Sequence, residues 1–254
     1  MKTFNWLKIL KKPFKKNFLR KISTSNNLIQ KLILKLNAKT SIFTKLESLI
    51  LRNFCNNKKN KKFTILQIGA NDGKICDPLN WIIKNTNCNA FLIEPVPIYF
   101  KALKSEYSKF NNVECINKCI TDKTGKVFMH IVNPGSEIFN WQKGIASLDA
   151  NHYKRSKTNK KLIKKIEVDS INFTDLINSF NIKNIDVLVI DCEGYDIELI
   201  KLFPFNIFTP KIIMIEFDLD RVYSPEQGCE AFDFLLKNGY KYFHKDSDDL
   251  IAYK

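Results

Sequence analysis

The sequence predicts an α/β fold in which a doubly wound, mainly parallel sheet occupies the chain from about Phe63 to the C-terminus. From that residue on, short apolar runs alternate with stretches of helical periodicity, which is the pattern of successive strand–helix units around a parallel sheet. The chain then closes with two short strands that are joined too tightly to be anything but an antiparallel hairpin. A chain of 254 residues is long enough for one such core preceded by an extension.

Apolar runs predict five parallel strands, at residues 63–68, 90–94, 113–120, 185–191 and 211–217. Residues 123–170 form an insertion between the third and fourth strands, with a strand predicted at Lys126–Val132 and a polar, lysine-rich stretch at 150–165. An insertion of this kind usually carries specificity.

The C-terminal elements are predicted from capping and turn signals. Ser224 supplies an N-cap, Pro225 suits the first helical position and Gln227 completes a capping box, so a helix is expected over 225–238 and Gly239 closes it. Strands at 240–244 and 250–253, joined by the turn 246–248, form the predicted hairpin.

Residues 1–62 are predicted to be a basic helical extension and linker. Apolar side chains recur at helical spacing between residues 4 and 54, whereas residues 56–62 contain no apolar side chain. Residues 1–62 hold 17 lysines and arginines against one glutamate, and residues 63–254 hold 24 basic against 25 acidic side chains. The excess positive charge of the protein therefore lies in its first quarter.

This charge distribution bears on partners. A neutral body argues against a nucleic-acid groove, and no nucleic-acid partner is expected. The extension, with Trp6, Leu10 and Phe14 among its lysines, is suited to peripheral contact with an anionic membrane, although a solvated basic face is the simpler interpretation. The N-terminus has no unbroken apolar region typical of a signal peptide, and the seven cysteines include no Cys-x-x-Cys pair. The expected location is the cytoplasm, with the extension able to contact the inner membrane surface.

The turn after the first strand is predicted to bind a ligand. Gly69 and Gly73 let the backbone bend sharply and approach a ligand closely, and Asn71 tolerates a left-handed conformation. The Gly-x-Gly-x-x-Gly fingerprint of dinucleotide-binding folds is not met, which disfavours a nicotinamide enzyme. A plain tight turn is the alternative.

Acidic residues follow the next two strands. Glu94 lies 25 residues after Gly69 at the end of the second strand, where a carboxylate can accept both hydroxyl protons of a ribose. Asp122 follows the third strand, where it can accept the amino group of an adenine, although a single Asp before a turn is more often ordinary turn chemistry.

The fourth and fifth strands end in clusters of acids. The fourth is followed by Asp191, Glu193 and Asp196, and the fifth by Glu216 and Asp218. Close placement of these carboxylates is unfavourable unless a function uses it. Such a cluster can act as a general base, orient a cationic ligand or bind a divalent metal, with Asp191, Glu216 and Asp218 as the metal candidates. The alternative is capping of the following helices, which is most plausible for Asp196.

The segment Ile65–Lys254 resembles the FkbM-type methyltransferases. The motifs that carry the resemblance occur in order at Leu66–Lys74, Asp77–Leu79, Leu92–Pro97, Ile190–Asp196, Ile213–Glu216 and Asp248–Tyr253. The resemblance implies a Rossmann-like class I methyltransferase fold, S-adenosylmethionine as methyl donor and an O-methylated sugar, polyketide or related small molecule as product. It also points to polysaccharide biosynthesis, with a glycan hydroxyl as the acceptor.

The resemblance further implies roles for individual residues. Gly69, Asn71 and Gly73 would line the methionine part of the donor, Glu94 the ribose and Asp122 the adenine. The full cofactor-binding set comprises Gln67, Gly69, Asn71, Asp72, Gly73, Glu94, Pro95, Asp122 and Asp191. The catalytic set comprises Asp191, Glu193 and Glu216. Val189 and Asp196 depart from a frequent form of the family, in which lysine and glutamate are common at these positions.

The mechanism expected on this basis is in-line methyl transfer to a hydroxyl oxygen, with a carboxylate as base. A divalent metal that lowers the pKa of the hydroxyl is a less favoured variant. The alternative from another functional class is a non-catalytic scaffold of the same fold in a complex of surface-glycan biosynthesis, anchored through its basic N-terminus.

Overall fold

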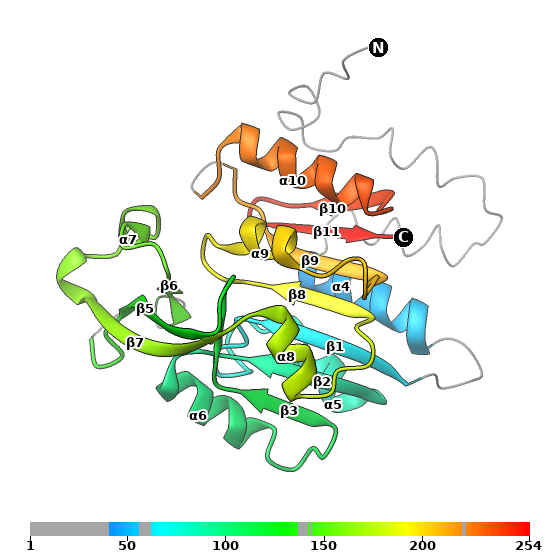
Figure 1. The fold of residues 1–254 in the computed structure, drawn as a ribbon, viewed down its shortest axis with the longest axis horizontal. Coiled ribbons are helices and arrows are strands. Elements are labelled where there is room, and N and C mark those ends of the chain that lie inside the picture. The colour runs from blue at the N-terminus through cyan, green and yellow to red at the C-terminus, as the bar shows by residue number, and fades with distance from the viewer. Residues whose placement is uncertain (1–40, 56–61, 137–141, 143, 220–221) are drawn as a thin grey trace.

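The computed structural model describes residues 41–55, 62–136, 142, 144–219 and 222–254 (Figure 1). The predicted helices before residue 41 and the predicted linker at 56–61 lie outside the described residues, as does most of the basic extension with its expected membrane contact. None of the helices within the described residues is both long and apolar enough to span a bilayer.

A seven-stranded sheet forms the centre of the molecule, with the strand order β10-β11-β9-β8-β1-β2-β3. Its strands are β1 (Phe63–Ile68), β2 (Cys88–Ile93), β3 (Val113–Ile116), β8 (Val187–Ile190), β9 (Ile212–Glu216), β10 (Tyr242–Lys245) and β11 (Asp249–Tyr253). Strands β3, β2, β1, β8 and β9 pair in parallel, and β11 pairs antiparallel with both β9 and β10. The predicted five parallel strands, the C-terminal hairpin and the Rossmann-like class I methyltransferase fold are therefore confirmed.

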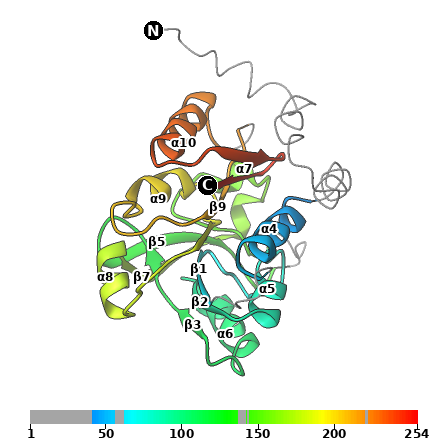
Figure 2. The ribbon, with the colours of Figure 1, turned by 90° about the vertical axis from the view of Figure 1, so that its right-hand side faces the viewer.

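Helices cover both faces of this sheet (Figure 2). On one face lie α8 (Phe173–Ser179), α9 (Asp196–Leu202) and α10 (Pro225–Lys237), and on the other lie α4 (Ile42–Ile50), α5 (Asn80–Asn85) and α6 (Pro97–Glu106). Burial on both faces explains why β8 is an unbroken apolar run, since all four of its residues are buried. The predicted C-terminal helix is confirmed as α10, with the Ser224–Gln227 capping box in place.

Helix α4 is part of the domain core. Its side chains Ile42, Leu46, Leu49 and Ile50 are buried, and it packs against β9 and β11. A π-helical turn, Leu51–Cys55, follows. Packing of the core therefore includes residues before Phe63. Helical periodicity identified this segment, but it could not show which surface the apolar face would cover.

The insertion forms a second sheet, which the sequence revealed only in part. Its strand order is β4-β7-β5-β6, with β4 (Cys119–Ile120), β5 (Gly125–Val132), β6 (Ala146–Ser147) and β7 (Ile163–Ile171). The predicted strand at Lys126–Val132 is confirmed as β5, whereas the predicted third strand at 113–120 divides into β3 and β4, one in each sheet. The lysine-rich stretch includes the short helix α7 (His152–Arg155), a 3-10 turn (Lys160–Leu162) and the start of β7. Exposed cross-strand pairs such as Lys126–Glu167 account for the charged residues of β7.

We expect the variant Leu46→Ala to lower the free energy of unfolding by about 2–5 kcal/mol, because it leaves a cavity between α4 and the sheet. The measurement is urea denaturation of the full chain followed by circular dichroism. Thr44→Ala, on the exposed side of the same helix, is the control and should change the value by no more than about 0.5 kcal/mol. Equal effects of the two variants would show that α4 does not belong to the cooperative core.

Candidate active site

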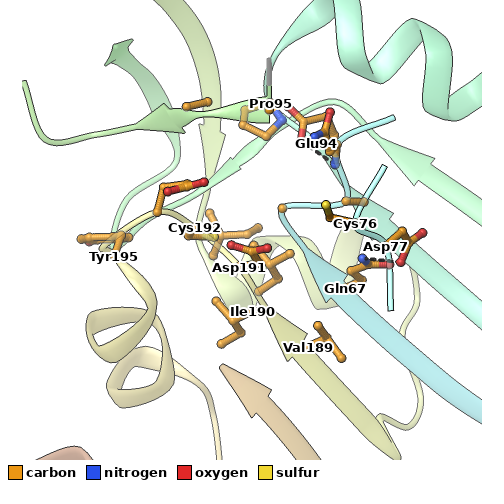
Figure 3. A pocket seen from close by; sticks show the side chains of 18 of the residues that line it. Gln67, Cys76, Asp77, Glu94, Pro95, Val189, Ile190, Asp191, Cys192 and Tyr195 are labelled. Carbon is orange, nitrogen blue, oxygen red and sulfur yellow. Dashed lines mark hydrogen bonds between the residues drawn. The ribbon is translucent and has the colours of Figure 1, made fainter. Parts of the chain in front are cut away.

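A cavity of about 130 Å³ opens at the carboxyl ends of β1, β2 and β8. The strand order reverses between β1 and β8, and ligands of open α/β sheets bind at such a switch point. Figure 3 shows the side chains of Gln67, Asp77, Glu94, Asp191 and Tyr195 around this space. The sheet thus brings together residues that are far apart in the sequence.

The turn after β1 is held by close approach of the neighbouring strands. The N–H groups of Gly69 and Ala70 both donate to the carbonyl of Ile93, at 3.0 and 2.9 Å, and the N–H of Asp191 donates to the carbonyl of Ile68 at 2.9 Å. Gly69 has φ +86°, and a Cβ on it would lie 1.8 Å from the backbone oxygen of Asp191. Only glycine fits here. Asn71 has φ 48°, the left-handed conformation that its residue type predicted.

Glu94 is buried at the end of β2 and fastens this turn. One carboxylate oxygen accepts the N–H of Asn71 at 2.9 Å, and the other accepts the N–H of Val96 at 2.7 Å. Burial, with a smaller contribution from the charge of Asp72, raises the pKa of Glu94 to about 7. Glu94 also lines the cavity, as does Pro95. Each of its oxygens accepts one backbone N–H, so each retains a lone pair for a ligand hydroxyl.

Gln67 and Asp77 form a buried polar pair on another wall. The amide nitrogen of Gln67 donates to a carboxylate oxygen of Asp77 at 3.1 Å. The amide oxygen of Gln67 is buried and accepts no hydrogen bond within the part of the chain that the structure describes. A buried acceptor without a partner is costly, so this oxygen is suited to a donor on a bound ligand.

The acids that follow β8 and β9 lie close together. The group contains Asp196 in place of Asp218, which was a metal candidate from the sequence. One carboxylate oxygen from each of Asp191, Asp196 and Glu216 lies within 4.8 Å of the others. Asp196 is fully buried and accepts hydrogen bonds from the N–H groups of Cys192 and Gly194, at 3.0 and 3.2 Å, and from the hydroxyl of Tyr223 at 3.0 Å. Asp196 therefore holds the loop after β8.

Asp191 and Glu216 share a negative environment. The side chain of Asp191 is accessible from the cavity. Desolvation by the surrounding protein is the largest cause of its raised pKa, and the negative charges of Glu193 and Asp196 add to it. Burial, then the charges of Asp196 and Glu193, raises the pKa of Glu216 to about 11. Burial and the neighbouring charges therefore both favour the protonated form of Glu216.

Five predicted site residues do not line this cavity: Asp72, Gly73, Asp122, Glu216 and Asp218. The Asp122 side chain is 60% exposed, Asp218 is buried, and one Asp72 oxygen accepts the N–H groups of Lys74 and Ile75. The third member of the acid cluster is therefore Asp196, in place of Asp218.

The cavity also has lining residues to which the sequence assigned no role. They include Phe43 of α4, Asp77, Met214 of β9, Tyr195 and Asp249 of β11. The motifs at 77–79, 190–196, 213–216 and 248–253 contained Asp77, Tyr195, Met214 and Asp249, so a signal existed for these four. Phe43 could be placed only after α4 had been docked on the sheet.

The Methyltransferase FkbM domain, as described by a model of that protein family, matches residues 67–242. A search of curated proteins found no match. Among solved structures, the methyltransferase FkbM from Methylobacillus flagellatus KT is 12% identical, with a TM-score of 0.48 over 80% of this chain and 46% of that chain. The precorrin-6y C5,15-methyltransferase from Geobacter metallireducens GS-15 is 13% identical, with a TM-score of 0.40 over 83% and 89% of the two chains. A chain of a fibrillarin/Nop5p complex is 17% identical, with a TM-score of 0.41 over 83% and 80%.

We expect Gly69→Ala to lower the free energy of unfolding by about 2 kcal/mol or more, because alanine at positive φ is strained and its Cβ would collide with the end of β8. Thermal and urea unfolding would measure this loss. Gly135→Ala serves as the control, since its φ is not positive and the nearest atom to a new Cβ is 4.0 Å away. If the two variants were equally stable, the close packing of β1 on β8 would not be the constraint inferred here.

Proposed function

Because the chain belongs to the FkbM methyltransferase family, we propose that it transfers a methyl group from S-adenosylmethionine to a hydroxyl of a sugar, glycan or related small molecule. The observation that carries this proposal is the cavity at the switch point of the sheet, where a glycine turn, a buried glutamate and an acid cluster meet. When bound, S-adenosylmethionine supplies an electrophilic methyl group on a sulfonium cation.

The residues present fit this donor. The partnerless amide oxygen of Gln67 suits the ammonium group of the methionine part. The two oxygens of Glu94 suit the two hydroxyls of the ribose, since each has accepted only one backbone N–H. Gly69 and Asn71 keep the backbone of the turn close to the space between these two groups.

Asp191 is the proposed proton acceptor. Its raised pKa makes the carboxylate a stronger base, and a sulfonium cation nearby favours its ionised form. Glu216 supports this state by keeping its own proton, because three carboxyls so close together cannot all be ionised. The acceptor oxygen bonds to the methyl carbon as the carbon–sulfur bond breaks and its electron pair stays on sulfur. The hydroxyl proton moves to Asp191.

A metal-free reaction fits the cluster better than a metal-dependent one. Asp196 already accepts three hydrogen bonds from protein donors, so little of its ligand capacity remains. Asp218, the third metal candidate from the sequence, is buried and does not line the cavity. We therefore propose that neither added magnesium nor a chelator changes the rate.

The affinity for S-adenosylmethionine should increase as the pH rises through about 7, the pKa of Glu94. The sign follows from the contact, because ribose hydroxyls donate to the ionised carboxylate and binding therefore favours loss of the proton. Below that pH each unit should weaken binding by at most about tenfold. Isothermal titration calorimetry from about pH 6 to about pH 8 would measure it.

Glu94→Gln is the matched variant, since it keeps the shape and has no carboxyl to titrate. It should bind roughly tenfold or more weakly at about pH 8, with a flatter pH profile. An unchanged slope in a folded Gln variant would remove Glu94 from the cofactor contact.

Asp191→Asn should retain S-adenosylmethionine affinity within a few fold and lower methyl transfer by about 10²–10⁴-fold, the contribution of a positioned base. Release of S-adenosylhomocysteine with neutral methyl glycosides as acceptors would report the rate. Asp122→Asn, on the exposed surface outside the cavity, is the control and should keep the wild-type rate. A fully active Asp191→Asn enzyme would exclude Asp191 as the base.

A further inference from the structure

A second cavity, of about 220 Å³, adjoins the first. One water requires only about 10–15 Å³ of such space, so the cavity has room for part of a small ligand. Asp191, Glu193 and Asp249 line both cavities. A ligand in the second cavity would therefore border the proposed methyl donor across these three acids.

One wall of this cavity comes from the insertion. Ile145, His152, Arg155 and Ser156 supply it, and three of them belong to α7 or adjoin it. The acids at the ends of β8, β9 and β11 supply the opposite side. The segment expected from the sequence to carry specificity thus faces the proposed base.

A chain of polar contacts fixes His152 in this wall. A nitrogen of Arg155 donates to Asp149 at 2.6 Å, and its other terminal nitrogen lies 3.3 Å from Nδ1 of His152. Arginine can only donate, so Nδ1 of His152 is the acceptor in this contact. A neutral imidazole that accepts at Nδ1 carries its proton on Nε2. His152 therefore presents an N–H donor toward the acids.

Within the described residues, this donor has no aligned hydrogen-bond acceptor. His152 is 4% exposed, and its Nε2 lies 3.1 Å from a carboxylate oxygen of Glu193 without the alignment of a hydrogen bond. The Nε–H of Arg155 is also buried without a partner among the described residues. The cavity thus combines unsatisfied donors with carboxylate acceptors, which is the arrangement that hydroxyl groups match because they both donate and accept.

We propose that the second cavity binds the methyl acceptor and selects an uncharged sugar, with His152 donating to one sugar oxygen and Glu193 accepting from a neighbouring hydroxyl. This inference rests on the proposed methyltransferase function. It places the reacting hydroxyl beside Asp191, which borders both cavities.

The charge of the cavity supports an uncharged ligand. Five acidic residues line it: Asp191, Glu193, Glu216, Asp248 and Asp249. The only lysine or arginine among its described lining residues is Arg155, whose charge is paired with Asp149. Burial and mutual repulsion already raise the pKa of Glu216 and Asp249. A uronic acid or a phosphorylated sugar would add a further negative charge to this cluster and would therefore be disfavoured.

A metal ion ligated by His152 is a poorer occupant on chemical grounds. A metal binds the unprotonated nitrogen of a histidine, whose other nitrogen then usually donates to a carboxylate or carbonyl. Here the contact from Arg155 occupies Nδ1 as an acceptor and leaves the proton on Nε2. His152 thus faces the cavity as a donor.

The test uses the full chain with S-adenosylmethionine and two probes, methyl glucoside and methyl glucuronoside. The variants His152→Phe and His152→Asn remove a donor from the position of Nε2, whereas His152→Gln restores an amide N–H near it. His130→Gln is the matched control, because His130 on β5 lines neither cavity. S-adenosylmethionine affinity and melting temperature are measured for every variant.

We expect methylation of the glucoside and little of the glucuronoside. His152→Phe and His152→Asn should lower kcat/KM by about 10–100-fold, mainly through KM, while donor affinity stays within a few fold. His152→Gln should recover most of the activity, and His130→Gln should equal the wild type. If His152→Phe does not fold, the test is the difference in kcat/KM between His152→Asn and His152→Gln.

Several outcomes would overturn the inference. These are wild-type KM in both loss variants, equal use of the charged glycoside, or no methylation of either probe by protein that binds S-adenosylmethionine. The first two of these outcomes leave the proposed methyltransferase function intact. Failure of the wild-type protein to bind S-adenosylmethionine would instead refute the proposed function.

Discussion

The contact between the ends of β1 and β8 is the constraint on which the site depends. Because Gly69 has no side chain, the backbone of Asp191 can lie against it, and the N–H of Asp191 reaches the carbonyl of Ile68. This contact brings the acid cluster of β8 beside the turn of β1. Glu94 then holds the same turn from β2 through the N–H of Asn71. The close contact of Gly69 with Asp191 thus places the residues proposed to bind the methyl donor beside the acid proposed to accept the proton.

The acids at the sheet edge are tolerated because each is stabilised differently. Asp196 is satisfied by three protein donors, and burial favours the protonated form of Glu216, whose pKa is raised to about 11. Asp191 keeps access to solvent through the cavity. The loop from Asp191 to Asp196 is strained at Glu193, which has φ 52°, whereas Gly194 adopts φ +100° without strain. Strain and clustered acids in one loop are expected at a functional site, where chemistry outweighs stability.

Local signals in the sequence were sufficient for the main sheet but not for what packs around it. The buried strands are continuous apolar runs, and Ser224 and Gln227 mark the start of α10 without any tertiary information. Glu94 and Asp191 could be selected because parallel strands bring their carboxyl ends to one edge. Asp122 and Asp218 follow strands in the same way, yet neither lines the cavities, because the placement of a loop side chain depends on packing. For the same reason, Phe43 and His152 became visible as site residues only in three dimensions.

Phe43 and His152 show that different parts of the fold supply residues to the site. Gln67, Glu94 and Asp191 lie on the central sheet, within the span that matches the family. Phe43 comes from α4, outside that span, and His152 comes from the insertion, which carries its own small sheet. A donor common to a whole family needs a constant cradle, which a rigid sheet edge supplies. Acceptors differ between enzymes, and connecting segments can change without disturbing the sheet. The proposed donor site is thus built mainly on the sheet edge, with Phe43 of α4 added to its lining, and the insertion supplies one wall of the proposed acceptor site.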